Sequence, residues 1–541
     1  MGRNDNRSRR QFLQQTLAGL TTLSAATGAL GSRRAHAAIG GLQRRRHLIN
    51  IMTSGGVDSL WWQNGVHSSE YFPLSRTDGG AIVQGTPGSL GFVNPADILA
   101  PFNNNNASVR PKVTWDLRFP DSFLSTHPFQ ADRLLGPGMS GFTADDLQST
   151  LIWRGISPEG GHFLGNRIIQ TGTTGDQTPS FPAVIAHLLS QDYVRPLHYA
   201  QLARDPSSMC NQSGSLSGPA LPINIPDLEA WASVTNNKDG LSSDRRTLLN
   251  DTVRALTQQM GASALRLPRS KGLFASFMDF FNGAVTVGGS NYATSAEFTA
   301  LVGKYADEMT TALGTHVFKG WFPSSSLFSM NISRKSTAQE VEFYNLASRF
   351  ALAEFLVVHD LAAVVDLPTL HTDFHQQVDD ECGTMLAIYT GYRVLVRSLR
   401  QTEWPAGSGK SLLDVTTVVM HTEFDRDPLL SGDNLMLNRS GTGHFDRGGS
   451  LLMSGMGVRG GAVVGDFKRA SVGRYTDADY PASTFIPFSA LPIDPRTGLP
   501  SPTGRVVTMR AIYPTLLSIF GAGDFAAING GEAPLPAIFA A

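Results

Sequence analysis

One short segment contains an aspartate and two histidines within a span of five residues. The segment LHTDFHQQ (370–377) contains His371, Asp373 and His375. Because they are spaced by two, an extended segment would point all three to one side, and a carboxylate beside an imidazole is a workable pair of ligands for a divalent cation. A helix N-terminal cap with two solvated histidines is the alternative interpretation.

Two further segments place an acid directly after an apolar run. HTEFDRDP (421–428) follows such a run and contains Glu423, while SGGVDS (54–59) follows another and presents Asp58 after two glycines. Glycine lets the backbone turn sharply at the end of a strand. A surface salt bridge between Glu423 and Arg426, and a simple Asx turn at Asp58, are the competing explanations.

A fourth segment, GTGHFDRGGS (441–450), surrounds His444 with glycines. It reads as a loop, and a lone histidine in such a loop is most often only solvated. Its interest lies in the three segments that precede it along the chain, since together they supply the nitrogen and oxygen ligands of a metal site.

The elements that must position these residues are short buried strands alternating with amphipathic helices. Apolar runs predict strands, and apolar residues recurring at three and four positions predict helices. Such alternation favours an α/β fold with three αβα layers, a mostly parallel central sheet and ligands at the carboxyl ends of the strands. The predicted strands lie in 47–56, 149–156, 361–368 and 416–424, the predicted helices in 340–360, 381–401 and 510–523, and a helix-rich insertion or subdomain in 200–345.

The N-terminal residues predict a twin-arginine export signal. Arg9 and Arg10 precede a mildly apolar run that leads to the small-x-small site at Ala35 to Ala37. Residues 1–37 would then be removed, leaving residues 38–541 as the mature α/β domain. We expect a periplasmic or secreted protein that engages the twin-arginine translocation machinery. An amphipathic N-terminal helix is the alternative.

Composition narrows the classes of partner. With 44 basic and 45 acidic residues, the formal net charge is −1, so no general field attracts nucleic acid or anionic lipid. Two cysteines cannot form a cysteine-rich metal site, so any metal must be held by His, Asp and Glu. Beyond the signal, no window approaches the ~18 apolar residues of a membrane span. We expect a small-molecule or polymer substrate.

The order of these segments resembles the alkaline-phosphatase and sulfatase superfamily. More closely, the chain resembles the domain-of-unknown-function family 1501, often exported by the twin-arginine route, which carries G-G-x-D, W-D-T-H, S-E-F-G-R-T-P and D-H motifs followed by a glycine run. HTEFDRDP lines up with the third motif, and GMGVRGGAVVG (455–465) matches the glycine run. The resemblance covers roughly residues 45–530 and implies an alkaline-phosphatase-like fold.

The resemblance also implies a set of metal ligands. Asp58 stands for the first aspartate, Asp373 and His375 for the W-D-T-H pair, Glu423 for the motif glutamate and His444 for the histidine of D-H. The nitrogen and oxygen ligands favour zinc or manganese over calcium, which prefers oxygen alone, while magnesium also remains open. Four positions depart from the family motifs: Phe374, Asp425, Asp427 and Gly443.

The nucleophile is where the chain departs most from the superfamily. Sulfatases carry a cysteine or serine at a fixed spacing before L-T-G, whereas here His162 stands at that distance from Thr171-Gly172. We expect His162 to lie near the substrate as a catalytic residue with Arg426, and Arg167 and His371 to contact the substrate anion.

Two hypotheses follow from these residues. The first is an exported metal-dependent hydrolase of phosphate or sulfate esters. The alternative is a catalytically degenerate member of the superfamily, an exported binding or assembly protein, because fold does not imply function. A redox enzyme has little support, since the sequence lacks a cysteine cluster and a convincing dinucleotide fingerprint.

Overall fold

The structure is a computed structural model. It describes these residues: 45–57, 62–65, 74–76, 82–84, 124–159, 162–175, 177–192, 195–203, 213–216, 218–225, 292, 295–315, 338–369, 372, 378–430, 442–445, 449–469, 488–523 and 532–540.

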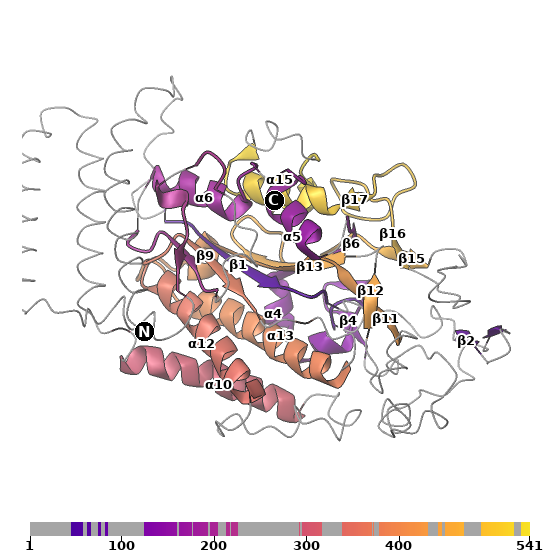
Figure 1. Cartoon of the computed structure of the whole chain (residues 1–541), viewed down its shortest axis with the longest axis horizontal. Coiled ribbons are helices and arrows are strands. Elements are labelled where there is room, and N and C mark those ends of the chain that lie inside the picture. The colour runs from indigo at the N-terminus through magenta and orange to yellow at the C-terminus, as the bar shows by residue number, and fades with distance from the viewer. Residues whose placement is uncertain are drawn as a thin grey trace, which may run out of the picture.

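A large sheet forms the centre of the molecule (Figure 1). Its strands run in the order β14-β6-β13-β10-β1-β9-β7-β8, with β17 also paired to β6. All neighbouring strands are parallel except β13, which is antiparallel to both β10 and β6. The strands of this sheet are β1 (His47–Thr53), β6 (Thr150–Ser157), β7 (Tyr199–Gln201), β8 (Ile223–Asn224), β9 (Val364–Pro368), β10 (Thr416–Thr422), β13 (Gly449–Gly455), β14 (Ala462–Val464) and β17 (Val507–Thr508).

Four small two-stranded sheets accompany the large one. They pair β2 (Leu74–Arg76) with β3 (Ile82–Gln84), β4 (Ser125–His127) with β5 (Gln130–Leu135), β11 (Asp425–Leu430) with β12 (Thr442–Phe445), and β15 (Phe467–Arg469) with β16 (Phe488–Ala490).

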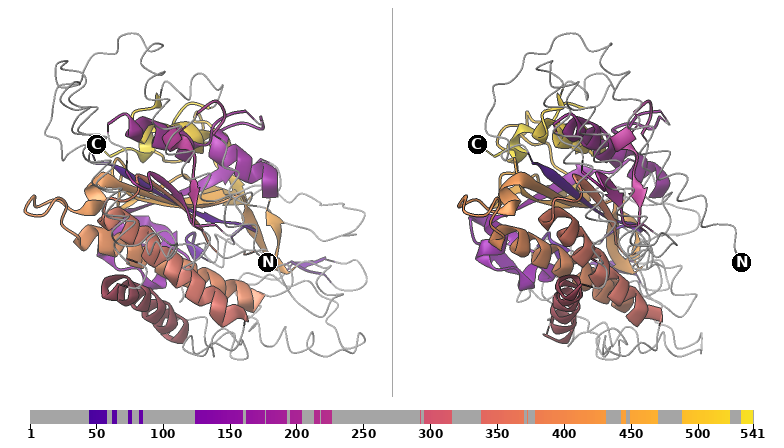
Figure 2. Two further views of the ribbon diagram at one scale, coloured as in Figure 1. Left: turned by 60° about the vertical axis from the view of Figure 1, so that its left-hand side comes forward. Right: turned by 90° about the vertical axis from the view of Figure 1, so that its left-hand side faces the viewer.

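Helices cover both faces of the large sheet, as Figures 1 and 2 show. Alternate residues of each strand face opposite sides, so Ile49 and Ile51 of β1 pack toward one helical layer and Leu48 toward the other. The first layer contains α4 (Ala144–Gln148), α10 (Ala296–Thr315), α12 (Ala338–Val358) and α13 (Val378–Gln401). The second contains α5 (His162–Thr171), α6 (Phe181–Ser190) and α15 (Ile512–Ile519).

The predicted α/β class with a mostly parallel sheet is confirmed. The predicted strands correspond to β1, β6, β9 and β10, and the predicted helices to α12, α13 and α15. Within 200–345, β8 belongs to the main sheet, and α10 packs on α12 and α13. Among the described residues, no helix is both long and apolar enough to cross a membrane.

A glycine sets the close approach of two helices in the first layer. A Cβ added at Gly391 of α13 would run into the ring of Phe350 on α12, whereas one added at Gly303 of α10 would meet nothing within 4 Å. We expect Gly391→Ala to lower the free energy of unfolding by about 1–3 kcal/mol through overpacking. Gly303→Ala should raise it by up to about 1 kcal/mol because alanine favours helix. Chemical denaturation of both variants would check this, and equal midpoints would contradict it.

Candidate functional site

The carboxyl ends of four strands meet at one edge of the large sheet. β1, β9, β10 and β6 all run in the same direction, and antiparallel β13 begins where they end. Crevices at this edge are where open α/β sheets bind ligands. The segments that follow these strands supply the residues of the candidate site.

Glu423 stands directly after β10 and is buried, with 3% of its surface exposed. Its Oε1 accepts a hydrogen bond of 2.6 Å from the backbone N–H of Gly55, which follows β1. The same oxygen lies 3.1 Å from Nδ1 of His162, the first residue of α5. A carboxylate oxygen only accepts, so Nδ1 is the donor, and the neutral ring then carries its lone pair on Nε2. Three segments distant in sequence thus meet at one carboxylate.

Glycines allow these three segments to approach. Gly55 and Gly56 have φ of 101° and 80°, the left-handed region that favours glycine, so β1 can turn directly into the site. A Cβ on Gly165 of α5 would lie only 2.7 Å from the backbone oxygen of Glu423. The sequence patterns S-G-G and H-F-L-G therefore bring the turn and the helix against the end of β10.

The second carboxylate oxygen of Glu423 distinguishes this site. Oε2 is buried and has no hydrogen-bond partner among the described residues. Leaving a buried acceptor unsatisfied costs roughly 1–3 kcal/mol, and more when the group is charged. An oxygen in this condition is suited to hold a cation, because a buried carboxylate is stabilised by pairing or by metal coordination.

Three of the predicted metal ligands, Asp58, Asp373 and His375, fall outside the described residues. His371, predicted to contact the substrate, and Arg9 and Arg10 of the predicted export signal lie outside them as well. The residues that precede Asp58 and Asp373 are described and lie at the site. Val57 donates its N–H to the oxygen of Phe424 at 3.3 Å, and Thr372 donates its N–H to the oxygen of Ser54 at 2.8 Å.

His444 lies on a strand, so the prediction that it belongs to a glycine-rich loop is wrong. It belongs to β12, where its Cα pairs with that of Arg426 on β11, the strand that follows Glu423. Pairing with β11 gives this glycine-containing segment a ladder of backbone hydrogen bonds, which outweighs its loop-like composition because strand propensity depends on context. The register places His444 and Arg426 opposite each other, three residues beyond Glu423.

Arg167 packs along its own helix. Its guanidinium lies 4.6 Å from the ring centroid of Phe163, and Nη1 donates to the oxygen of Thr174 at 3.3 Å. Phe163 is 58% exposed. Arg167 is therefore half-buried on α5 beside the exposed Phe163 ring, between one and two turns of helix beyond His162.

A buried polar network underlies the site, which sequence reasoning missed. Nε2 of His421 donates to Oδ1 of Asn50 at 2.9 Å, and Nδ2 of Asn50 donates to Oδ1 of Asp366 at 2.9 Å. Tyr199 donates its hydroxyl to Oδ2 of Asp366 at 2.5 Å. Burial lowers the pKa of His421 to about 3, so it is neutral. The available signal was one polar residue inside each apolar strand, at Asn50 and Asp366.

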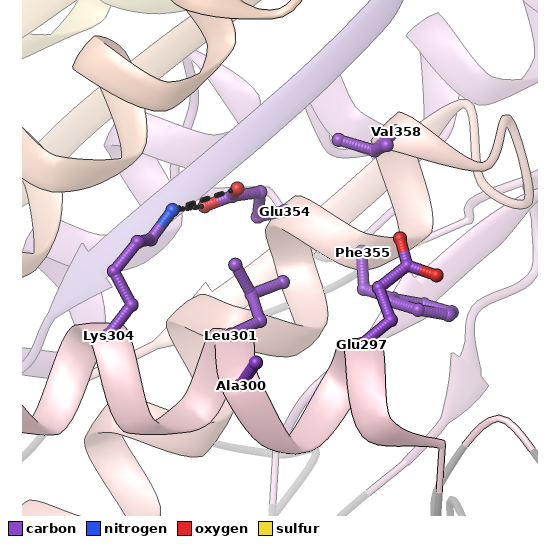
Figure 3. Close-up of a pocket in the computed structure, with 7 residues that line it drawn as sticks. All are labelled: Glu297, Ala300, Leu301, Lys304, Glu354, Phe355 and Val358. Atoms are coloured by element: carbon purple, nitrogen blue, oxygen red, sulfur yellow. Dashed lines mark hydrogen bonds and ion pairs between the residues drawn. The ribbon is translucent and has the colours of Figure 1, made fainter.

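A pocket elsewhere in the molecule does not coincide with this chemistry. A cavity of about 290 Å³ lies between α10 and α12 (Figure 3). These helices belong to the first helical layer, whereas α5, which carries His162, belongs to the second. Lys304 and Glu354 of its lining are already paired at 3.0 Å. The part of the chain that the structure describes instead places a buried carboxylate oxygen without a hydrogen-bond partner, Oε2 of Glu423, at the sheet edge. Within the described residues, no group of three or more His, Cys, Asp and Glu could hold a metal ion.

Comparison with known proteins yields one match. The model of a family described as "Protein of unknown function (DUF1501)" matches residues 152–482, which is more than half of the chain. The chain belongs to this family. No curated protein and no solved structure matches it. The part that matches the DUF1501 family contains His162, Glu423 and His444.

Proposed function

We propose that this member of the DUF1501 family is a hydrolase of phosphate or sulfate esters that depends on a divalent cation. The observation that carries the proposal is the buried Oε2 of Glu423, which lacks a donor among the described residues at the ligand-binding edge of the sheet. An alkaline-phosphatase-like fold is part of the same proposal, and a mostly parallel sheet with helices on both faces is compatible with it.

The donor set fits a hard or borderline divalent cation. Glu423 would be one ligand, and Asp58, Asp373, His375 and His444 would complete the site from the segments that follow β1, β9 and β11. Mixed nitrogen and oxygen donors favour zinc or manganese, with calcium or magnesium possible. A bound cation would supply Lewis acidity toward the ester oxygens and lower the pKa of water at the site.

The chain's own residues would orient the side chains of the site and accept the proton of the attacking water. The Gly55 N–H holds Oε1 of Glu423 in place, which leaves Oε2 as the oxygen for the cation. Glu423 in turn fixes His162 with its lone pair on Nε2, the atom suited to accept a proton from an attacking water. Arg426, Arg167 and His371 are the groups we propose for contacts with the substrate anion.

Export completes the proposal. The sequence signal around Arg9 and Arg10 supports translocation by the twin-arginine machinery to the periplasm or beyond. An anionic ester, small or polymeric, would be met there.

One feature favours the second candidate, an exported binding or assembly protein without turnover. Where sulfatases have a hydroxyl or thiol, this chain has His162, and its Nδ1 contacts Glu423. Such a protein would bind a cation yet hydrolyse nothing.

Metal content and activity, measured on the same samples, test the proposal. We expect the purified mature protein to contain stoichiometric zinc or manganese by plasma mass spectrometry, and to hydrolyse nitrophenyl phosphate or sulfate. Asp373→Ala and His444→Ala should lose both, because each removes a ligand. Asp307→Ala, which removes an exposed carboxylate of α10, is the matched control. A metal-free, inactive wild type would contradict the proposal, and a metal-loaded but inactive one would favour the binding protein.

A further inference from the structure

Thr372 is a buried residue that the predicted chemistry does not use. None of its surface is exposed. Its backbone N–H donates to the oxygen of Ser54 at 2.8 Å, and its hydroxyl lies 2.9 Å from that oxygen and 2.6 Å from the oxygen of Gly56. A hydroxyl has one proton, so it donates to one of these carbonyls at a time, with Gly56 the closer.

These contacts surround the residue that holds the candidate carboxylate. Ser54 and Gly56 flank Gly55, whose N–H donates to Oε1 of Glu423 at 2.6 Å. Gly55 and Gly56 adopt positive φ, a conformation that glycine permits but does not impose, because it populates many others equally well. Neighbouring contacts must therefore select the turn that aims the Gly55 N–H at Glu423.

We infer that Thr372 is the positioning residue that selects this turn and so aligns the Gly55 N–H with Glu423. Its backbone bond and its hydroxyl bond bracket Gly55 from the side of the chain that follows β9. The hydroxyl is the specific part, because valine has the same shape but cannot donate to a carbonyl. The consequence for cation binding rests on the proposed function, whereas the consequence for the turn does not.

The chain offers a matched control for the loss of a hydroxyl. Thr369 follows the same strand, β9, and its hydroxyl donates to Oγ1 of Thr53 at 3.1 Å. Thr369→Val therefore removes one buried hydroxyl between the ends of the same two strands while leaving the carbonyls of the turn alone. Thr372→Ser retains the donor and removes only a methyl group.

Site-resolved hydrogen–deuterium exchange of the full mature chain without added metal tests the inference directly. In Thr372→Val the Gly55 amide should exchange about three- to tenfold faster, the effect of losing one buried hydrogen bond. Thr372→Ser and Thr369→Val should leave its rate close to that of wild type. Unchanged exchange in Thr372→Val, or equal acceleration in Thr369→Val, would overturn the inference.

Titration with Mn²⁺ alone, followed by calorimetry, gives the second readout. Loss of groups that orient a metal ligand typically weakens affinity by about 10–100-fold, so we expect that range for Thr372→Val, with recovery in Thr372→Ser. A metal-free wild type that binds neither Mn²⁺ nor Zn²⁺, each titrated alone, would refute the proposed cation site, and the exchange of Gly55 would still decide the role of Thr372. Wild-type affinity in Thr372→Val would contradict the role in ligand positioning.

Discussion

Replacement of Glu423 by glutamine is expected to abolish cation binding and hydrolysis while leaving the fold intact. Glutamine retains the carbonyl oxygen that can accept from Gly55 but cannot supply a charged ligand. Removing groups that only orient a ligand already costs about 10–100-fold in affinity, so loss of a direct ligand should cost at least about 100-fold. Turnover of nitrophenyl phosphate or sulfate should fall in parallel.

A measurement of unfolding distinguishes a role of Glu423 as a metal ligand from a purely structural role. Glu423 is buried and its Oε2 has no hydrogen-bond partner among the described residues, so a neutral isostere relieves the cost of burying a charge. The unfolding midpoint of the metal-free Glu423→Gln variant should therefore match or exceed that of wild type. The control is Glu297→Gln, because Glu297 also meets an imidazole, with Nε2 of His359 at 2.9 Å, but is 59% exposed on α10. A Glu423→Gln protein that binds metal normally would refute the assignment, and one that unfolds would indicate a structural carboxylate.

Acidification below about pH 6.5 is expected to destabilise the fold steeply. Burial lowers the pKa of His47, His198 and His421 to about 3 in each case, and the charge of nearby Arg195 adds to this effect for the first two. The unfolded chain, with histidine pKa values near 6.5, takes up these protons first. The stabilisation is therefore complete above about pH 6.5, declines as the pH falls, and is gone below about pH 3.

The magnitude is large for a marginally stable fold. At pH 5 each such histidine costs about 2 kcal/mol, and three together cost about 6 kcal/mol, within the usual 5–15 kcal/mol of total stability. Denaturant unfolding by circular dichroism between pH 5 and pH 8 measures this slope. His421→Gln should reduce the slope by about a third. Phe181→Leu, which changes the ring 6.3 Å from His421 and removes no titrating group, controls for packing loss. An unaltered slope in His421→Gln would contradict the explanation.

The main elements of the fold were predictable from periodicity. The run HLINIMT is apolar enough for a strand buried on both faces, and β1 is indeed fully buried across its length. The helices α12 and α13 follow from apolar positions at three and four residues. The antiparallel direction of β13 was not predicted, because local pattern carries no information about which neighbour a strand pairs with or in which direction.

The residues of the candidate site were predictable from the sequence, but their contacts with one another were not. Glu423 was identified because an acid follows an apolar run, and His162 because it occupies the nucleophile position of a related superfamily. Their contact joins residues 261 positions apart. The assignment of His444 to a loop failed because pairing with β11 depends on a partner strand that glycine content does not reveal.

An α/β sheet with acids and histidines at strand ends could be predicted from the residues alone, because burial and periodicity are local properties of the side chains. The convergence of the Gly55 N–H and His162 on one oxygen of Glu423, and the contacts of Thr372 with the turn at Ser54 to Gly56, emerged only in three dimensions. Such contacts follow from strand order and from glycine backbone angles, which neighbouring strands select through packing and hydrogen bonding.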